Sequence, residues 1–325
     1  MDNCDAEAEA CGPVINSSDD APVWGMRLTT DLFRLGMDQR TLARKLRHGE
    51  LVKVRRGAYR SPRVLSPEET HLEMVRATIA QTPTAVVASH VSAAVVHRMP
   101  IDRRRLGQVH LLHPGSARSW VRGNVVRRTR ATVDSTVVND IPVTTLATTT
   151  LDLLRLLDFA DAVAVADCAL RRHVDPGDLL AAIEAQPGRR GNVGARHALA
   201  FADPLSESAG ESHTRVGIAR AGLPAPVLQL RLVDRLGAMR PDFAWPGRRL
   251  LAEFDGRVKY TRGVTAGADP EAVMVAEKER ELRLRRLGWW VVRVVWADLA
   301  STENLAALIH DGFDAARPLA DRAHP

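Results

Sequence analysis

Cysteine and long apolar runs are both scarce in this chain of 325 residues, and each scarcity excludes a class of protein. The three cysteines, Cys4, Cys11 and Cys168, provide neither a disulfide framework nor the paired spacing of a zinc site. No apolar run approaches the roughly 18 residues that a membrane-spanning helix needs, and no basic stretch followed by an apolar core opens the sequence. We therefore expect a cytoplasmic protein with no membrane partner.

Lysine is the next scarce residue. Only Lys45, Lys53, Lys259 and Lys278 are lysines among 45 basic residues, so arginine is used almost wherever a positive charge is needed. Arginine does not lose its proton in a protein, whereas the pKa of a lysine can be shifted and its ammonium acts as a compact charge. Lys259 and Lys278 lie close in sequence to an acidic pair described below, which points to chemistry there.

Basic residues are absent from the first 25 positions, which hold six acids. The remainder carries 45 bases against 33 acids, a net charge of +12, and the pI of the whole chain is about 9.8. A body this basic favours a polyanionic partner, with nucleic acid ahead of a generic solubility charge. Residues 1–23, rich in Asp, Ala and Ser, are expected to form a disordered acidic tail.

Residues 24–63 have the order helix, tight turn, helix and basic hairpin, which is typical of a winged helix-turn-helix. TTDLFRLG predicts a short helix that stops at Gly36. DQRTLARKLRHG predicts a second helix with Asp38 as N-cap and Gly49 as terminator. LVKVRRGAYR predicts two strands around the turn at Arg56 and Gly57.

The second helix and the hairpin form the predicted DNA-binding surface, because residues 24–63 hold eleven bases and three acids. The polar face of such a helix enters the major groove, and cations on the hairpin suit phosphate. A small helical cap with a solvated face is the alternative. The predicted contact residues are Gln39, Arg40, Thr41, Arg44 and Arg47 on the helix and Lys53, Arg55 and Arg56 on the hairpin.

Residues 64–202 alternate apolar helices with short strands and are expected to form a mixed α/β region. SPEETHLEMVRATIAQ opens with a capping box, Ser66 to Glu69, and QVHLLHP and GNVVRRTR read as strands. Four histidines in this region fit no metal-ligand spacing and are interpreted as ordinary polar or core residues. They are His90, His97, His110 and His113.

The first half of the chain resembles the AbiEi family of antitoxins. The resemblance lies in LVKVRRGAYR, SHVSAAVVHRMP and DIPVTTLATTTLDLLR, and it covers about Arg27 to Arg172. It implies a winged helix-turn-helix followed by a mixed α/β region, binding to double-stranded DNA, repression of the protein's own operon and a cognate toxin as partner. It implies no catalysis.

Residues 203–300 predict the order α-β-β-β-α-β. SESAGESHTRVGIARAGLP reads as a helix, and PVLQLRLVD, RPDFAW and RLLAEFD as strands, the last two joined by a turn at Pro246 and Gly247. DPEAVMVAEKERELRLRRLG predicts a long helix with Asp269 as N-cap, and WWVVRVVW, apolar on both faces, predicts a central strand. Residues 301–325 are expected to form a C-terminal helix and tail.

Glu253 and Asp255 stand two residues apart in the last strand of the hairpin, so both carboxylates should lie on one face. A turn centred on Pro246 and Gly247 would pair Asp242 with Leu251 and place Asp242 diagonal to Glu253, roughly 7–8 Å away by Cα. Carboxylate oxygens without Cys or His suit Mg²⁺ or Mn²⁺. Such an ion would neutralise the acids and could activate water against a phosphodiester.

Proline-aspartate followed by a strand with an acid-x-acid pair resembles the PD-(D/E)XK nuclease superfamily, and most closely the domains related to very-short-patch repair endonucleases. RPDFAW, LLAEFDGRVKY and EKERELRLRRLGWWVVRVVWADL carry the resemblance, which covers about Pro204 to Leu299. It implies that Asp242 and Glu253 are metal ligands and that Asp255 occupies the position of the motif's lysine. Lys259 or Lys278 could supply the missing charge; otherwise the domain is a pseudo-nuclease that binds DNA.

Glu211 has two interpretations that the sequence leaves open. The first helix of this superfamily often contributes a glutamate to the metal site, whereas Ser208 and Glu211 also have the spacing of a capping box. Arg280 and Arg283 on the long helix either reach phosphate or belong to a solvated face.

The sequence thus predicts an α/β multidomain protein that binds DNA and carries a Mg²⁺-dependent endonuclease-like domain. The runner-up is a non-catalytic transcriptional regulator or antitoxin with an inactive nuclease-like domain. An RNA-processing factor is a third reading, which two Tyr, six Phe and six Trp disfavour because single-strand recognition relies on stacking.

Overall fold

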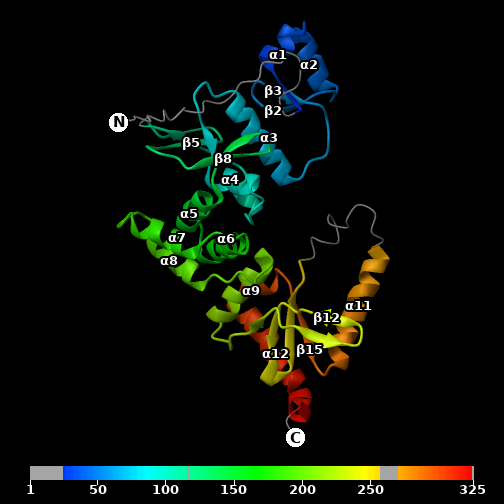
Figure 1. Cartoon of the computed structure of the whole chain (residues 1–325). Helices are drawn as coiled ribbons and strands as arrows, with labels where there is room; N and C mark the ends of the chain where they lie inside the picture. The colour runs from blue at the N-terminus through cyan, green and yellow to red at the C-terminus, as the bar shows by residue number, and fades with distance from the viewer. Residues whose placement is uncertain (1–24, 116–117, 257–269, 324–325) are drawn as a thin grey trace, which may run out of the picture. The chain divides into compact units, whose positions relative to one another are not determined.

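A computed structural model describes residues 25–115, 118–256 and 270–323 (Figure 1). The chain is α/β, as predicted, and its contacts divide it into an N-terminal unit, Met1–Asp152, and a C-terminal unit, Leu153–Pro325. The single boundary falls inside the expected middle region of residues 64–202 rather than near residue 63 or residue 202. The acidic tail expected at residues 1–23 and the predicted N-cap Asp269 lie outside the described residues.

The first segment of the N-terminal unit has the predicted order of helix, turn, helix and hairpin. Asp38 caps the second helix by accepting the Thr41 N–H at 2.7 Å, and Gly36 and Gly49 adopt positive φ where the helices stop. The structure adds a short strand before the first helix, giving a sheet of order β1-β3-β2. The elements are β1 Met26–Leu28, α1 Thr29–Arg34, α2 Gln39–Arg47, β2 Val52–Arg55 and β3 Ala58–Arg60.

This segment packs on the next helix, α3 Pro67–Ala80, and therefore does not stand apart as a domain. Met26, Ala58 and Ala77 form a buried cluster that joins β1, β3 and α3. Arg60 and Arg63 both pair with the buried carboxylate of Glu73 on α3. Apolar and charged contacts across residue 63 explain why the chain is not divided there.

The rest of the N-terminal unit is a six-stranded mixed sheet of order β6-β7-β5-β4-β9-β8. The pairs β5–β7 and β4–β9 are parallel, and the other neighbours are antiparallel. Its core includes Val109, Leu111, Val125 and Val143, against which α3 and α4 pack. The elements are β4 Val87–Ala88, α4 His90–Val96, η1 Arg103–Arg105, β5 Val109–Pro114, β6 Trp120–Arg122, β7 Val125–Arg130, β8 Ser135–Val138 and β9 Ile141–Thr144.

The C-terminal unit begins inside the helix α5 and continues with four further helices, the last of which is α9. Asp167 on α6 is buried, receives both a hydrogen bond from the Ser212 hydroxyl at 2.7 Å and an ion pair from Arg215 at 2.8 Å, and so ties α6 to α9. This buried pairing explains why no boundary lies near residue 202. The helices are α5 Leu146–Leu156, α6 Phe159–Arg171, α7 Pro176–Glu184, α8 Asn192–Phe201 and α9 Ala209–Arg220.

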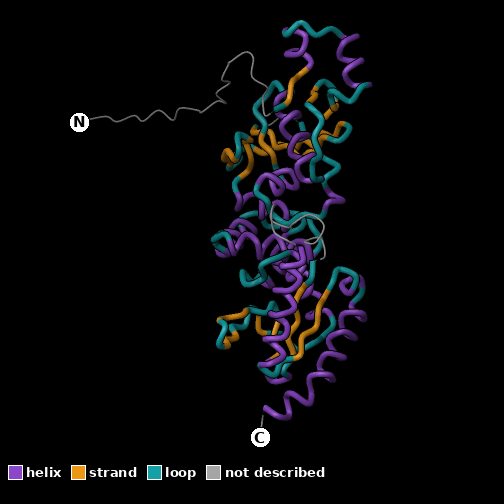
Figure 2. The backbone as a smooth tube through the Cα atoms, turned by 90° about the vertical axis from the view of Figure 1, so that its right-hand side faces the viewer, coloured by secondary structure: helices purple, strands orange, loops and turns teal. Residues whose placement is uncertain are grey.

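A four-stranded sheet of order β10-β13-β14-β15 forms the core of this unit, with helices on both faces (Figure 2). Phe243, Leu250 and Val292 pack toward α9 and α12, while Leu251 and Val291 pack toward α11. The elements are β10 Val227–Leu228, β11 Leu232–Asp234, β12 Gly237–Met239, β13 Phe243–Trp245, η2 Pro246–Arg248, β14 Leu250–Phe254, α11 Pro270–Arg286, β15 Trp290–Val294, η3 Asp298–Ala300 and α12 Thr302–Ala323.

Three details of the predicted C-terminal order are wrong. The strand β15 was expected to be central, but it is an edge strand among the described strands. Its two faces are apolar because α11 and α12 cover them. The strand predicted from PVLQLRLVD is interrupted at Gln229, which has φ +51°. The loop between β13 and β14 spans four residues and ends at Arg249 with φ +52°, so Ala244 pairs with Leu251. The same register places Asp242 opposite Glu253 instead of opposite Leu251.

Candidate functional site

The first turn of α9 lies unusually close to the end of β14. A Cβ added to Gly210 would come within 1.9 Å of a ring carbon of Phe254, so only glycine fits at this contact. The Ser208 side chain caps the helix by accepting the Glu211 N–H at 3.2 Å. The close approach and the cap together hold Glu211 against the end of the sheet.

At this end of the sheet, Glu211 and Asp242 share one partner, the side-chain amide of Gln229. Its Nε2 donates to Glu211 Oε2 at 3.3 Å and to Asp242 Oδ1 at 3.5 Å. The second oxygen of Asp242 accepts the Phe254 N–H at 2.8 Å, which fixes the carboxylate beside β14. An α-helix, a strand end and a kinked strand therefore bring two acids and an amide together.

The two carboxylates interact unfavourably as charged groups. Burial raises the pKa of Glu211, and the nearby charge of Asp242 raises it further, while the Glu207 N–H opposes both effects. Like charges in a desolvated place favour either a proton or a cation. Ser208 is the N-cap, as one interpretation of Glu211 expected, but the Glu211 carboxylate accepts the Glu207 N–H instead of the Ser208 N–H of a capping box, and it lies near Asp242.

Glu253 has a different environment. Its buried carboxylate pairs with Arg280 on α11, with Oε1 to Nη1 at 2.5 Å. Burial nevertheless raises the pKa of Glu253, and the positive charge of Arg280 only partly offsets that effect. Arg280 therefore already supplies the cation that a metal ion was expected to supply at this residue.

Asp255 and the two lysines do not join the site among the described residues. Asp255 is half-buried and lies 3.9 Å from Arg293, which also pairs with Glu277 at 3.0 Å. Lys278 is exposed on α11, and Lys259 lies outside the described residues. Within residues 25–115, 118–256 and 270–323, no group of three or more His, Cys, Asp or Glu side chains is arranged to hold a metal.

The predicted ligand set of Asp242, Glu253 and Asp255 is therefore not assembled in the part of the chain that the structure describes. The alternation of residues along a strand predicted that Glu253 and Asp255 face a shared metal ion. In the structure the Glu253 carboxylate lies against Arg280 of α11, and the Asp255 carboxylate lies near Arg293 of β15. The acids that meet are Glu211 and Asp242. Their donor chemistry fits a hard divalent ion, since Mg²⁺ is commonly held by one or two carboxylates and keeps several waters.

Gln229 is the residue that the sequence analysis missed. It stands between two leucines, and this amide between Leu228 and Leu230 is the signal that could have marked it. Its left-handed backbone is uncommon for a residue other than glycine, and such outliers concentrate at functional sites. The kink turns its side chain to Glu211 and Asp242.

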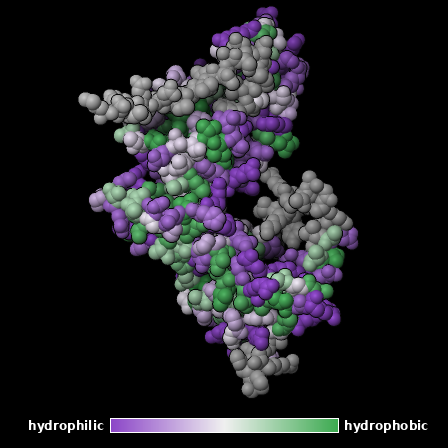
Figure 3. Space-filling view, viewed as in Figure 1, coloured by the Kyte–Doolittle hydropathy of each residue, from purple (hydrophilic) through white to green (hydrophobic). Residues whose placement is uncertain are grey.

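Most of the predicted DNA-binding side chains in the N-terminal unit are open to a partner. Gln39, Arg40, Arg44 and Arg47 are exposed on α2, and Thr41 is half-exposed. Hydrophilic side chains cover most of the visible surface of the α1–α2 segment (Figure 3). On the hairpin Lys53 and Arg56 are also exposed.

Arg55 differs from its neighbours on the hairpin. It is half-buried, donates to the Thr78 hydroxyl on α3, and has its pKa lowered by burial. It therefore lies in a pocket under the hairpin and not on the outer surface that was predicted for it.

Comparison with known proteins gives one clear relationship. No model of a known protein family matches the chain. Two proteins of Mycobacterium tuberculosis, the uncharacterized protein Rv2248 of strain H37Rv and the uncharacterized protein MT2308 of strain CDC 1551, are each 35% identical over 219 residues. The match covers 66% of this chain and 78% of each relative. The chain belongs to their family.

This mycobacterial family carries no assigned activity that could be transferred, because both relatives are uncharacterized. Among solved structures, the chain is similar to the crystal structure of the RV2827C protein from Mycobacterium tuberculosis, with 17% identity and a TM-score of 0.37. That likeness covers 64% of this chain and 83% of the other. None of the helices described in this chain combines the length and the hydrophobicity that a membrane span requires.

Proposed function

We propose that this chain is a cytoplasmic protein that binds double-stranded DNA and hydrolyses its phosphodiesters with a divalent metal ion. The observation that carries the proposal is the pair of carboxylates, Glu211 and Asp242, that converge on Gln229. The pair lies in a unit whose elements follow the order α9, β10, β13, β14, α11, β15, with one added hairpin. That order is the one implied by the resemblance to the PD-(D/E)XK superfamily.

In this proposal Glu211 and Asp242 hold Mg²⁺ or Mn²⁺, and the Phe254 N–H orients Asp242. A bound ion of this kind supplies an activated water and stabilises the leaving oxygen. Of the two lysines expected to position the attacking water, Lys278 is exposed on α11 and does not join this pair, so the proposal leaves that role to Lys259, which lies outside the described residues. The ion pair with Glu253 fixes the guanidinium group of Arg280 on α11. Arg280 also lines a groove of about 560 Å³ together with Arg240 and Arg283.

Reading of the DNA is proposed for α2, with Lys53 and Arg56 of the hairpin on phosphate. The exposed side chains of α2 support this, because base edges are read by a helix whose polar side is free. A fused reader would bring the hydrolytic unit to duplex DNA, since phosphate contacts give affinity without sequence choice.

A second candidate is a transcriptional regulator or antitoxin that binds DNA and a cognate toxin but does not cut. One observation favours it: Arg280 and Arg293 lie against Glu253 and Asp255, so two of the expected ligands already have cationic neighbours. A nuclease fold in which arginines replace the metal would serve for binding alone.

Cleavage of supercoiled plasmid and of linear duplex by the intact chain tests the two candidates. We expect nicked or linear product with Mg²⁺ or Mn²⁺ and none with EDTA, and we expect Glu253→Ala to weaken cleavage by disturbing the buried pair with Arg280. Tight binding of duplex without product under any divalent ion would instead establish the regulator and remove the enzyme.

A further inference from the structure

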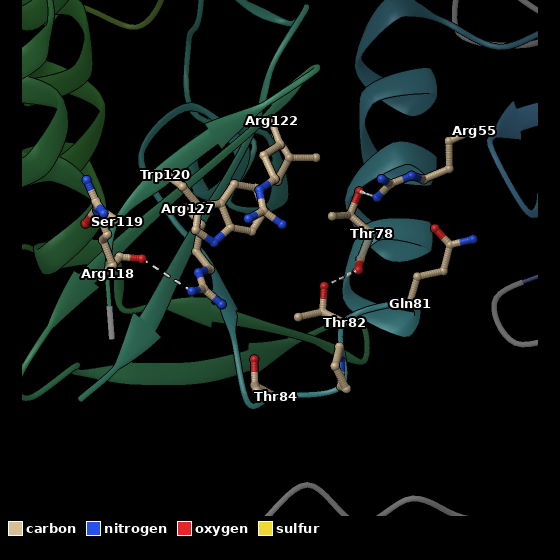
Figure 4. Close-up of a pocket in the computed structure, with 12 residues that line it drawn as sticks. Arg55, Thr78, Gln81, Thr82, Thr84, Arg118, Ser119, Trp120, Arg122 and Arg127 are labelled. Atoms are coloured by element: carbon tan, nitrogen blue, oxygen red, sulfur yellow. Dashed lines mark hydrogen bonds between the residues drawn. The ribbon is translucent and has the colours of Figure 1, made fainter. Parts of the chain in front are cut away.

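A pocket of about 860 Å³ lies in the N-terminal unit, between the end of α3 and the strands β6 and β7 (Figure 4). On one wall are Arg55 of the hairpin and Thr78 and Gln81 of α3 and its C-cap; on the other is Trp120 with Arg122 and Arg127. Among the residues that the structure describes, none that lines the pocket is acidic. Polar groups and positive charge therefore face one open pocket.

Trp120 fixes two of the charges. The guanidinium carbons of Arg122 and Arg127 lie 5.1 Å and 5.0 Å from its ring centroid, and Arg127 also donates to the Arg118 carbonyl at 3.3 Å. Cation–π contacts at these distances are attractive, most of all when the cation is partly desolvated. The indole ring of Trp120 therefore positions two guanidinium groups, and these groups occupy the ring against which a nucleic-acid base would otherwise stack.

Three of the four arginines that line the pocket have uncharged partners. Arg55 bonds a hydroxyl, while Arg122 and Arg127 contact a ring and a carbonyl. Two residues nearby, Arg60 and Arg63, pair with the buried carboxylate of Glu73 instead. Arg55 and Arg127 are half-buried, and a half-buried positive charge without a counter-ion among the described residues is costly, so this grouping favours an anionic ligand.

One feature opposes an anion, namely the C-terminal end of α3, which carries about half a negative charge. Its last carbonyls are already bonded, since Ala77 and Ile79 accept the N–H groups of Gln81 and Thr82. Three full positive charges outweigh this partial one. The Thr84 hydroxyl adds a hydrogen-bond donor on the same wall, whereas the Thr82 hydroxyl donates to the Thr78 carbonyl at 2.7 Å.

We propose that this pocket binds phosphate groups and that their source is the backbone of the DNA held by α2 in the same unit. Planar guanidinium groups match phosphate oxygens in paired hydrogen bonds, and they carry no information on sequence. The pocket would extend the DNA contact from the hairpin to β6 and β7. The choice of source rests on the proposed DNA binding; a free phosphorylated molecule would use the same chemistry.

Arg122→Gln/Arg127→Gln tests the site in the full chain, with Arg103→Gln/Arg104→Gln as the matched control. The control removes two charges from η1, where Arg103 pairs with Glu68 in the first turn of α3. A 14-residue helix is about 20 Å long, so the control lies far from the pocket. Binding of a duplex at several salt concentrations and binding of pyrophosphate are measured for both.

For the pocket variant we expect duplex affinity to fall at least about tenfold, the salt slope to shrink by about two, and pyrophosphate binding to be lost. Control affinities should stay within about twofold. The single variant Arg122→Gln should reduce the salt slope by about half as much as the double variant does. Because the Arg122 side chain is exposed, its replacement should not disturb folding, so this variant controls for misfolding of the double variant.

Two further outcomes separate this proposal from the proposed function. Loss of pyrophosphate binding with unchanged duplex binding supports the site and assigns it to a free phosphorylated ligand. If the intact chain binds no duplex, the proposed DNA binding fails, and the pyrophosphate measurement still decides the pocket. Pocket and control variants that behave alike in both measurements would overturn the phosphate site.

Discussion

Replacing Asp242 by asparagine is expected to lower the rate of Mg²⁺-dependent duplex cleavage by about 10³-fold, or about 4 kcal/mol in activation free energy. Asparagine keeps an oxygen that can accept the Phe254 N–H, which Asp242 accepts at 2.8 Å, so the end of the sheet should stay in place. It removes the negative charge that the divalent ion requires. Glu211→Gln should act in the same direction, because the two carboxylates share one site.

Asp311→Asn is the matched control for this experiment. Asp311 is exposed on α12 of the same unit, so its substitution removes one carboxylate without touching Glu211, Asp242 or Gln229. Initial rates of plasmid nicking are compared at equal protein concentration, after thermal unfolding has shown equal folding. Equal rates for Asp242→Asn and Asp311→Asn would mean that Asp242 holds no catalytic ion.

Arg40→Ala/Arg44→Ala is expected to weaken duplex binding by about 100-fold at moderate salt and to reduce the salt slope by up to about two. The two side chains are exposed and four residues apart, so they share one face of α2. Leu42, buried on the other side, keeps the helix packed when they are removed. Binding is measured by fluorescence anisotropy of a labelled duplex over a series of salt concentrations.

Arg103→Ala/Arg104→Ala supplies the control, since it also removes two charges from the N-terminal unit. If the Arg40→Ala/Arg44→Ala variant loses most of its affinity while the salt dependence of binding changes by less than about two, Arg40 and Arg44 contact base edges instead of phosphates. An α2 variant that binds as tightly as the control would refute the reading of DNA by this helix, whatever the pocket at Trp120 does.

Features set by neighbouring residues could be predicted from the sequence. The N-caps Asp38 and Ser66 and the helix stop at Gly36 were predicted correctly, because each depends on bonds or backbone angles within a few residues. The order α-β-β-β-α-β expected for residues 203–300 is present, with one hairpin, β11–β12, that was not expected. Asp242 was a candidate ligand because a local motif marked it, whereas Glu211 was a candidate through the resemblance to the nuclease superfamily.

Features set by packing could not be predicted. The register of β13 and β14 depends on the left-handed conformation of Arg249. A turn centred on Pro246 and Gly247 predicted a pairing of the two strands that is wrong by two residues. The lack of a boundary near residue 202 depends on the buried pair of Asp167 and Arg215. Glu253 was expected to face a metal, but its partner is an arginine that enters the site from another helix.

The most direct test is a titration of the intact chain with Mn²⁺, followed by electron paramagnetic resonance, against Glu211→Gln/Asp242→Asn. If two acids of this chain together hold one hard ion, the intact chain binds Mn²⁺ near neutral pH and the double variant loses at least about 100-fold in affinity. Acidification should weaken binding early, because burial and Asp242 raise the pKa of Glu211 and protons then compete. Indistinguishable Mn²⁺ curves for the two proteins would contradict the account.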